Sequence, residues 1–118
     1  MKTTIVKTTC NKLKEAKNLS KILLDKKLAA CIQIEKIVSY YNWQDKFCEE
    51  DEFLINIKTR KDLFPKLRKV IIKNHSYKVP QIIELEIKNI SKDYLKFILE
   101  NTKNSKKLVK NRKTLDKR

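Results

Sequence analysis

Hydrophobic and β-branched residues concentrate in four short segments of the chain, and in places they alternate with polar ones, which predicts four β-strands. In the third segment Phe53, Ile55 and Ile57 fall on one side of the chain, and polar residues separate them. A short polar stretch, residues 42–46, separates the second and third segments and predicts a turn. The predicted strands cover residues 3–9, 29–41, 51–59 and 81–87.

Between these segments the apolar spacing changes to three and four residues, which predicts amphipathic helices. The first helix is expected over residues 11–27, with Asn11 as its N-cap. The second is expected over residues 62–74, capped by Asp62, because Pro65 then falls in the first turn, where a missing N–H costs nothing. Ser91 is expected to cap a short last helix.

The element order is therefore β-α-β-β-α-β followed by a helix. This order predicts an α+β fold of the ferredoxin-like type, with an antiparallel four-stranded sheet and both main helices on one face. The opposite face then has no helix to cover it, although its strands are rich in Ile and Val. Oligomerisation is the economical way to bury such a face.

Length and charge refine this picture. The chain has 118 residues, with 29 Lys and Arg against 14 Asp and Glu, a net charge of +15. We expect one domain over residues 1–102 and a basic, solvated tail over residues 103–118, with an electrostatic arm as the alternative. Only four of the basic residues are Arg, the residue on which nucleic-acid sites depend, so we do not expect a nucleic-acid partner.

Other classes of protein are disfavoured by what the sequence lacks. An RNA-recognition motif needs stacking aromatic residues and glycines on its central strands, and this chain has no glycine. No apolar run is long enough to span a membrane, and no signal peptide is expected. The three cysteines form no C-x-x-C pair, so we expect a reducing, cytoplasmic location without disulfides.

Four stretches, in this order and at these intervals, resemble the CutA divalent-cation-tolerance family. They are Leu-Ala-Ala-Cys at residues 28–31, Ser-Tyr-Tyr-Asn-Trp-Gln-Asp-Lys at 39–46, the strand at 52–59, and His-Ser-Tyr-Lys-Val-Pro-Gln-Ile-Ile at 75–83. The resemblance covers about residues 3–100. Two departures are Asp45, where the family usually has Gly in the turn, and Ser76, where Pro usually follows the histidine.

The resemblance implies a cytoplasmic homotrimer in which the long second and third strands reach neighbouring subunits. It also implies a role in tolerance to divalent metals, with copper as the metal described for relatives, and no established enzymatic reaction. A likeness of such trimers to nitrogen-regulatory PII proteins leaves a signalling module, or an enzyme acting on a small polar ligand, as the alternative.

The candidate site follows from the same resemblance. His75 is the candidate metal ligand, and the alternative is a histidine that bonds the last carbonyls of its own helix. Trp43, Lys58, Tyr77 and Glu84 are expected to line a cleft between subunits near His75, or simply to build the trimer interface. We expect Lys58 and Glu84 to lie on neighbouring strands, where they can pair.

The remaining reactive residues are expected to be structural. Cys31 is interpreted as a small buried hydrophobic residue. Cys10 and Cys48 flank loops and have the chemistry of soft metal ligands, but they lack matching partners in sequence. The acidic run at residues 49–52 is interpreted as a solvated hairpin arm rather than a cation site.

Overall fold

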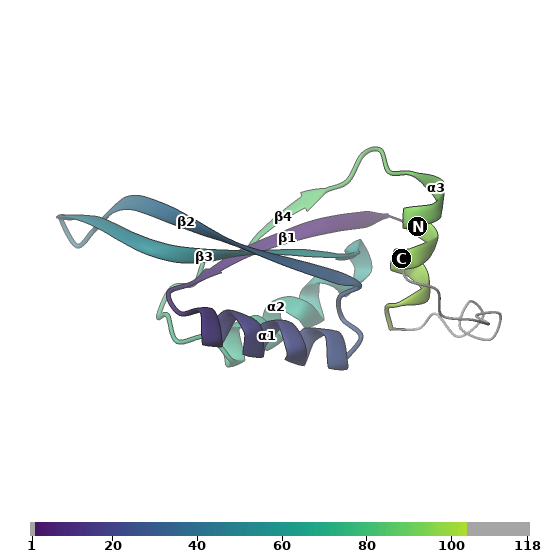
Figure 1. Ribbon diagram of the computed structural model, residues 1–118, viewed down its shortest axis with the longest axis horizontal. Helices are drawn as coiled ribbons and strands as arrows, with labels where there is room; N and C mark the ends of the chain where they lie inside the picture. Colours follow the sequence, from purple (N-terminus) through teal and green to yellow (C-terminus); the bar gives the residue numbers. More distant parts are fainter. Residues whose placement is uncertain (1, 104–118) are drawn as a thin grey trace.

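The computed structural model describes residues 2–103, and the predicted basic tail beyond residue 103 lies outside them. The four strands form one antiparallel sheet in the order β2-β3-β1-β4, and α1 and α2 lie together on one side of it (Figure 1). The predicted α+β fold is thus confirmed. The elements are β1 (Thr3–Cys10), α1 (Leu13–Asp25), β2 (Cys31–Trp43), β3 (Lys46–Arg60), a 3₁₀ turn (Lys61–Leu63), α2 (Phe64–Lys73), β4 (Ile83–Glu86) and α3 (Lys92–Glu100).

The hairpin of β2 and β3 is longer than the sequence pattern indicated. Pairing is continuous from Cys31 opposite Lys58 to Trp43 opposite Lys46, so only Gln44 and Asp45 remain for the turn. Both turn residues have positive φ angles, 50° and 63°. Two such residues are what a tight turn between twisted strands requires, although neither is glycine here.

Two of the three predicted helix caps are wrong. The N-cap of α1 is Lys12 and that of α2 is Leu63, and neither makes a side-chain cap bond. Asp62 instead accepts two hydrogen bonds from the guanidinium of Arg60, at 2.9 and 3.0 Å, so its carboxylate is not available to the helix. Ser91 does occupy the N-cap position of α3, again without a side-chain cap bond.

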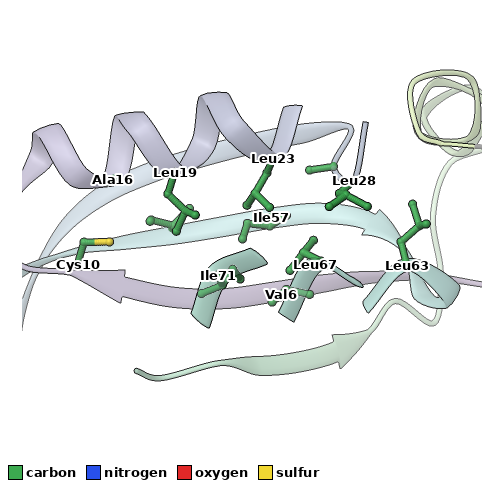
Figure 2. Packing of buried hydrophobic residues seen from close by; sticks show 12 residues of the cluster. Val6, Cys10, Ala16, Leu19, Leu23, Leu28, Ile57, Leu63, Leu67 and Ile71 are labelled. Atoms are coloured by element: carbon green, nitrogen blue, oxygen red, sulfur yellow. The ribbon is translucent and has the colours of Figure 1, made fainter. Parts of the chain in front are cut away.

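The hydrophobic core lies between the sheet and helices α1 and α2 (Figure 2). Val6 of β1 and Ile57 of β3 face each other across the ladder, and both are fully buried. Leu19 and Leu23 of α1 point at the same layer, as do Leu67 and Ile71 of α2. The three- and four-residue spacing of the helix positions therefore did identify the buried stripes.

The opposite face of the sheet is far less covered. Ile83 and Leu85 of β4 are 46% and 49% exposed, and α3 lies at one end of the sheet, away from the hairpin tip (Figure 1). Within residues 2–103 no helix combines the length and the apolar character that crossing a membrane demands. The uncovered apolar face that the sequence indicated is thus present in the single chain.

Candidate functional site

His75 lies just after α2, in the segment that leads back to the edge of the sheet. Its side chain is completely buried, and its Nε2 lies 2.7 Å from the carbonyl oxygen of Thr9 in β1. The backbone N–H of Tyr77 donates to Nδ1 at 3.0 Å, so the ring proton belongs on Nε2, which donates to Thr9. The ring therefore bonds β1 and not the end of its own helix, contrary to the alternative considered from the sequence.

Two further metal-binding side chains converge on this histidine. Cys10 Sγ lies 3.9 Å from His75 Nε2, and a Glu15 carboxylate oxygen lies 3.9 Å from Nδ1. One donor atom from each of Cys10, Glu15 and His75, hereafter the donor cluster, can be chosen so that all lie within 4.8 Å of one another. The two 3.9 Å distances run to different ring nitrogens of His75, and two ligands of a tetrahedral zinc ion are about 3.5 Å apart, so the cluster must contract around one nitrogen to hold a cation.

Glu15 is held in place by a residue that departs from the family pattern. The backbone N–H of Ser76 donates to one Glu15 oxygen at 2.8 Å, and the Ser76 hydroxyl donates to the other at 3.0 Å. A proline at this position has no N–H to donate. Ser76 therefore joins the first turn of α1 to the His75 segment and fixes the carboxylate beside the imidazole.

The surroundings of Cys10 favour the protonated thiol over the thiolate. Burial, and then the nearby Glu15 and Glu52 carboxylates, raise the pKa of Cys10 from 9.0 to about 12. A cation that binds the sulfur must displace this proton, and one that binds Nε2 must replace the bond to Thr9. The donor cluster is therefore assembled, although it is not in the protonation state that a bound cation requires.

A cavity of about 740 Å³ lies beside the donor cluster, over the face of the β2–β3 hairpin that the helices leave open. Trp43 and Tyr77, both predicted as site residues, line it. Tyr77 connects the two features, because its ring centroid lies 4.8 Å from that of His75. Within one chain, Trp43 and Tyr77 therefore line the same cavity, and Tyr77 also contacts His75.

Glu52 is the most deeply buried carboxylate at this cavity, at 5% exposure. Its two oxygens accept hydrogen bonds from the hydroxyls of Ser39 and Tyr77, each at 2.6 Å. The acidic run is thus not uniformly solvated as expected. Because side chains alternate along β3, Glu50 and Glu52 point to the cavity, whereas Glu49 and Asp51 are exposed.

Lys58 and Glu84 do not pair, and the expectation that they lie on neighbouring strands is wrong. β1 lies between β3 and β4, and Lys58 pairs with Ile5 while Glu84 pairs with Val6, so the two side chains point to opposite faces. Lys58 Nζ lies 5.5 Å from the ring of Tyr94, and Glu84 accepts from Lys61 at 3.3 Å. Neither residue lines the cavity within the chain.

Comparison with known proteins agrees with this arrangement. The family model described as "CutA1 divalent ion tolerance protein" matches residues 4–101. The chain belongs to the CutA1 family. A divalent-cation tolerance protein CutA of Pyrococcus horikoshii is 36% identical over 84% of this chain and 97% of its own length. The corresponding protein of Thermus thermophilus is 38% identical over 74% of this chain and 85% of its own length.

Solved structures of CutA1 proteins have the same fold. The crystal structure of CutA1 from Oryza sativa superposes with a TM-score of 0.85 at 33% identity, covering 88% of this chain and 96% of that one. The structure of CutA1 from Pyrococcus horikoshii gives a TM-score of 0.83 at 35% identity, covering 86% and 99%. The family and its link to divalent-cation tolerance are therefore shown for this chain.

Sequence reasoning missed several residues of the site. Cys10 and Glu15 were not recognised as partners of His75 because they lie 65 and 60 positions away along the chain, and only the fold joins them. Glu52 could have been found, because the same period of two that predicts the third strand places it on the face opposite Phe53, Ile55 and Ile57.

Proposed function

We propose that this CutA1 protein acts in divalent-cation tolerance by binding a cation directly at the donor cluster of Cys10, Glu15 and His75. The convergence of a thiol, an imidazole and a carboxylate within 4.8 Å is the observation that carries this proposal. Sulfur and imidazole donors favour copper, zinc and similar ions over magnesium or calcium. The proposal includes copper as a candidate ion, a cytoplasmic location and no enzymatic activity of its own.

The proposal also includes a homotrimer. The open face of the sheet and the tip of the β2–β3 hairpin leave large apolar side chains exposed, among them Phe47 at 71% and Leu85 at 49%. Side chains of this size on a continuous surface are typical of a contact between subunits. In a trimer, Lys58 and Glu84 are expected to join the cleft from a neighbouring chain.

The test is a competition titration of the reduced, full-length protein with Cu²⁺, Zn²⁺ and Co²⁺. Co²⁺ is included because a cobalt–thiolate bond gives its own charge-transfer absorption. We expect saturable binding that weakens at least tenfold in His75→Ala and a cobalt–thiolate band that is lost in Cys10→Ser. Cys48→Ser is the matched control, since Cys48 lies on the hairpin arm, outside the cluster, and must leave both signals unchanged.

The test also has a clear negative outcome. Binding that persists unchanged in both variants, with the fold intact by circular dichroism, places the cation elsewhere and overturns the proposal. His75→Gln guards against misfolding, because it removes the imidazole while retaining a polar side chain of similar length. Apparent affinity should rise with pH, because the Cys10 proton must leave.

A second function is favoured by the cavity itself. Its volume of about 740 Å³ lies within the range of roughly 300–1,000 Å³ that is usual for small-molecule sites. It contacts the donor cluster through Tyr77, so a ligand in it would be sensed at His75. We therefore keep binding of a small polar ligand, in a PII-like signalling role or as an enzyme substrate, as the second proposal.

A further inference from the structure

The cavity differs in charge from the rest of the chain. Basic residues outnumber acidic ones by 29 to 14 overall, but the residues that line the cavity include two carboxylates, Glu50 and Glu52, and one ammonium, Lys78. Among residues 2–103, no ion pair joins Lys78 to either carboxylate. A negative hollow on a basic protein selects for a positively charged occupant.

Aromatic side chains surround these carboxylates. Tyr41 and Trp43 of β2 alternate with Asn42, so both point to the open face, the same face as Glu50 and Glu52 of β3. Tyr77 approaches from the segment after α2. Tyr40 also borders the cavity, but its ring packs against Phe47 at 6.0 Å. Faces of Trp and Tyr rings attract cations, and the attraction strengthens where water is excluded.

Hydroxyl groups donate hydrogen bonds to both carboxylates of the cavity. Glu52 accepts hydrogen bonds from the hydroxyls of Ser39 and Tyr77, and Glu50 accepts one from the hydroxyl of Tyr41. The bond to Glu50 raises the pKa of Tyr41 to about 12. Both phenols act as hydrogen-bond donors here, so each carboxylate is oriented by a hydroxyl that points at it.

We propose that this cavity binds an organic ammonium ion, with Glu52 and Glu50 as counter-charges and the rings of Tyr41, Trp43 and Tyr77 as its aromatic walls. The inference rests on the second proposed function, a small-ligand site, and names its ligand class. Anionic metabolites are disfavoured, because within one chain the lining residues carry two carboxylates against the single ammonium of Lys78, and the Lys58 and Glu84 expected from a neighbouring chain have opposite charges that cancel. A bare magnesium or calcium ion is disfavoured as well, because it needs six or more oxygen ligands in a small cage.

The chain supplies a direct probe for the test. Trp43 is the only tryptophan, so intrinsic tryptophan fluorescence reports on the end of the hairpin that lines this cavity. The full-length, reduced protein is titrated with putrescine and with choline, which represent primary and quaternary ammonium ions. 1,4-Butanediol and succinate are the neutral and anionic comparisons of matched length.

We expect at least one of the two amines to change the fluorescence saturably, and the diol and succinate to have no effect. Glu52→Gln should weaken amine binding at least tenfold, because it removes the charge and keeps the shape. Glu49→Gln is the matched control, since Glu49 lies on the same strand but is exposed on the opposite face. Added salt should weaken the binding of the amines.

Two results would overturn the inference. If succinate or the diol bound saturably and as tightly as the amines, the cavity would still be a small-ligand site. It would not select ammonium ions, and the inference would be wrong. Binding of amines that is unchanged in Glu52→Gln, with circular dichroism showing an intact fold, would reject this cavity as the site. Because cobalt binding to the donor cluster is measured separately, either failure leaves the cation proposal to its own test.

Discussion

The two halves of the β2–β3 hairpin share one unbroken ladder but differ completely in burial. At the base, Ile55 and Ile57 are fully buried beneath α1 and α2. At the tip, Tyr40 and Phe47 are 62% and 71% exposed, because the strands extend beyond the ends of both helices (Figure 1). The same backbone pairing thus supports a core at one end and a projecting arm at the other.

This difference teaches that backbone pairing alone does not account for the length of the arm. A two-stranded hairpin is only marginally stable in water unless something packs against it. The base has its helices, and the tip has no partner among the described residues. The cavity extends from the border between the halves, where Ser39 and Glu52 meet Tyr77, to Trp43 and Gln44 at the tip. A neighbouring subunit and a bound ligand would together supply the missing contacts.

The largest expected effect is a loss of stability at the base of the β2–β3 hairpin. Ile57→Ala should lower the free energy of unfolding by about 2–5 kcal/mol, because it opens a cavity in a layer closed by α1 and α2. Val38→Ala, in the more exposed part of β2, should cost less than about 1 kcal/mol. Urea denaturation of both variants measures the contrast, and equal losses would show that the two halves are packed alike.

The next effect tests the tip as a subunit contact. Phe47→Asp places a charge on the most exposed large apolar side chain of the arm and should shift the protein from trimer towards monomer. Sedimentation equilibrium at micromolar concentration measures the mass. Leu24→Asp, on α1, is the control and should not change it, since Leu24 is exposed away from the arm. A trimer that survives Phe47→Asp would remove the tip from the interface.

The fold was predictable to the extent that it rests on local periodicity. Alternation in β3 and three- and four-residue spacing in α1 and α2 indicate core positions such as Ile55, Ile57, Leu19 and Leu67 from the sequence. The far end of the hairpin was missed because residues 46–50 are polar or exposed, so no alternation marks them as strand. The start of α2 was misplaced because the carboxylate of Asp62 accepts hydrogen bonds from the guanidinium of Arg60 and does not cap the helix.

The site was predictable only where the family resemblance named its residues. Trp43 and Tyr77 line one cavity and Tyr77 contacts His75, whereas the contact of Cys10 with His75 depends on how the segment after α2 crosses the end of β1. Such a contact leaves no periodic trace in the sequence. The error about Lys58 and Glu84 has the same origin, because strand order in a sheet is not strand order in the chain.

Cys10 pairs with Phe53 at the border between base and tip, and ionisation of its thiol should lower stability at high pH. Its pKa is raised to about 12, so the stability it contributes is complete below about pH 9 and is lost as the pH rises through about 12. Between these pH values the free energy of unfolding of the wild type should fall more steeply than that of Cys10→Val. The difference in slope should be at most about 1.4 kcal/mol per pH unit. Urea midpoints at about pH 8 and about pH 11 measure it, with Cys48→Val behaving as wild type. Parallel pH profiles for Cys10→Val and the wild type would show that Cys10 is not desolvated.

The smallest expected effect compares two left-handed residues, one in each region. Lys27 has a φ of 57° where α1 ends, and Asp45 has a φ of 63° at the hairpin tip. Lys27 lies in a Schellman turn, since the N–H of Leu28 bonds the carbonyl of Leu23. A lysine pays a steric cost in this conformation that glycine avoids, so Lys27→Gly should raise stability by about 0.5–1 kcal/mol.

Asp45→Gly should gain only a few tenths of a kcal/mol, because Asp tolerates the left-handed conformation better than Lys and because the tip is more exposed. Lys26→Gly is the control: its φ of −82° is ordinary helix geometry, so glycine there should only destabilise. Denaturation midpoints rank the three variants. Equal gains in stability from Asp45→Gly and Lys27→Gly would show that the tip is as rigid as the helix-covered layer. The two halves of the hairpin would then differ in solvent exposure and not in stability.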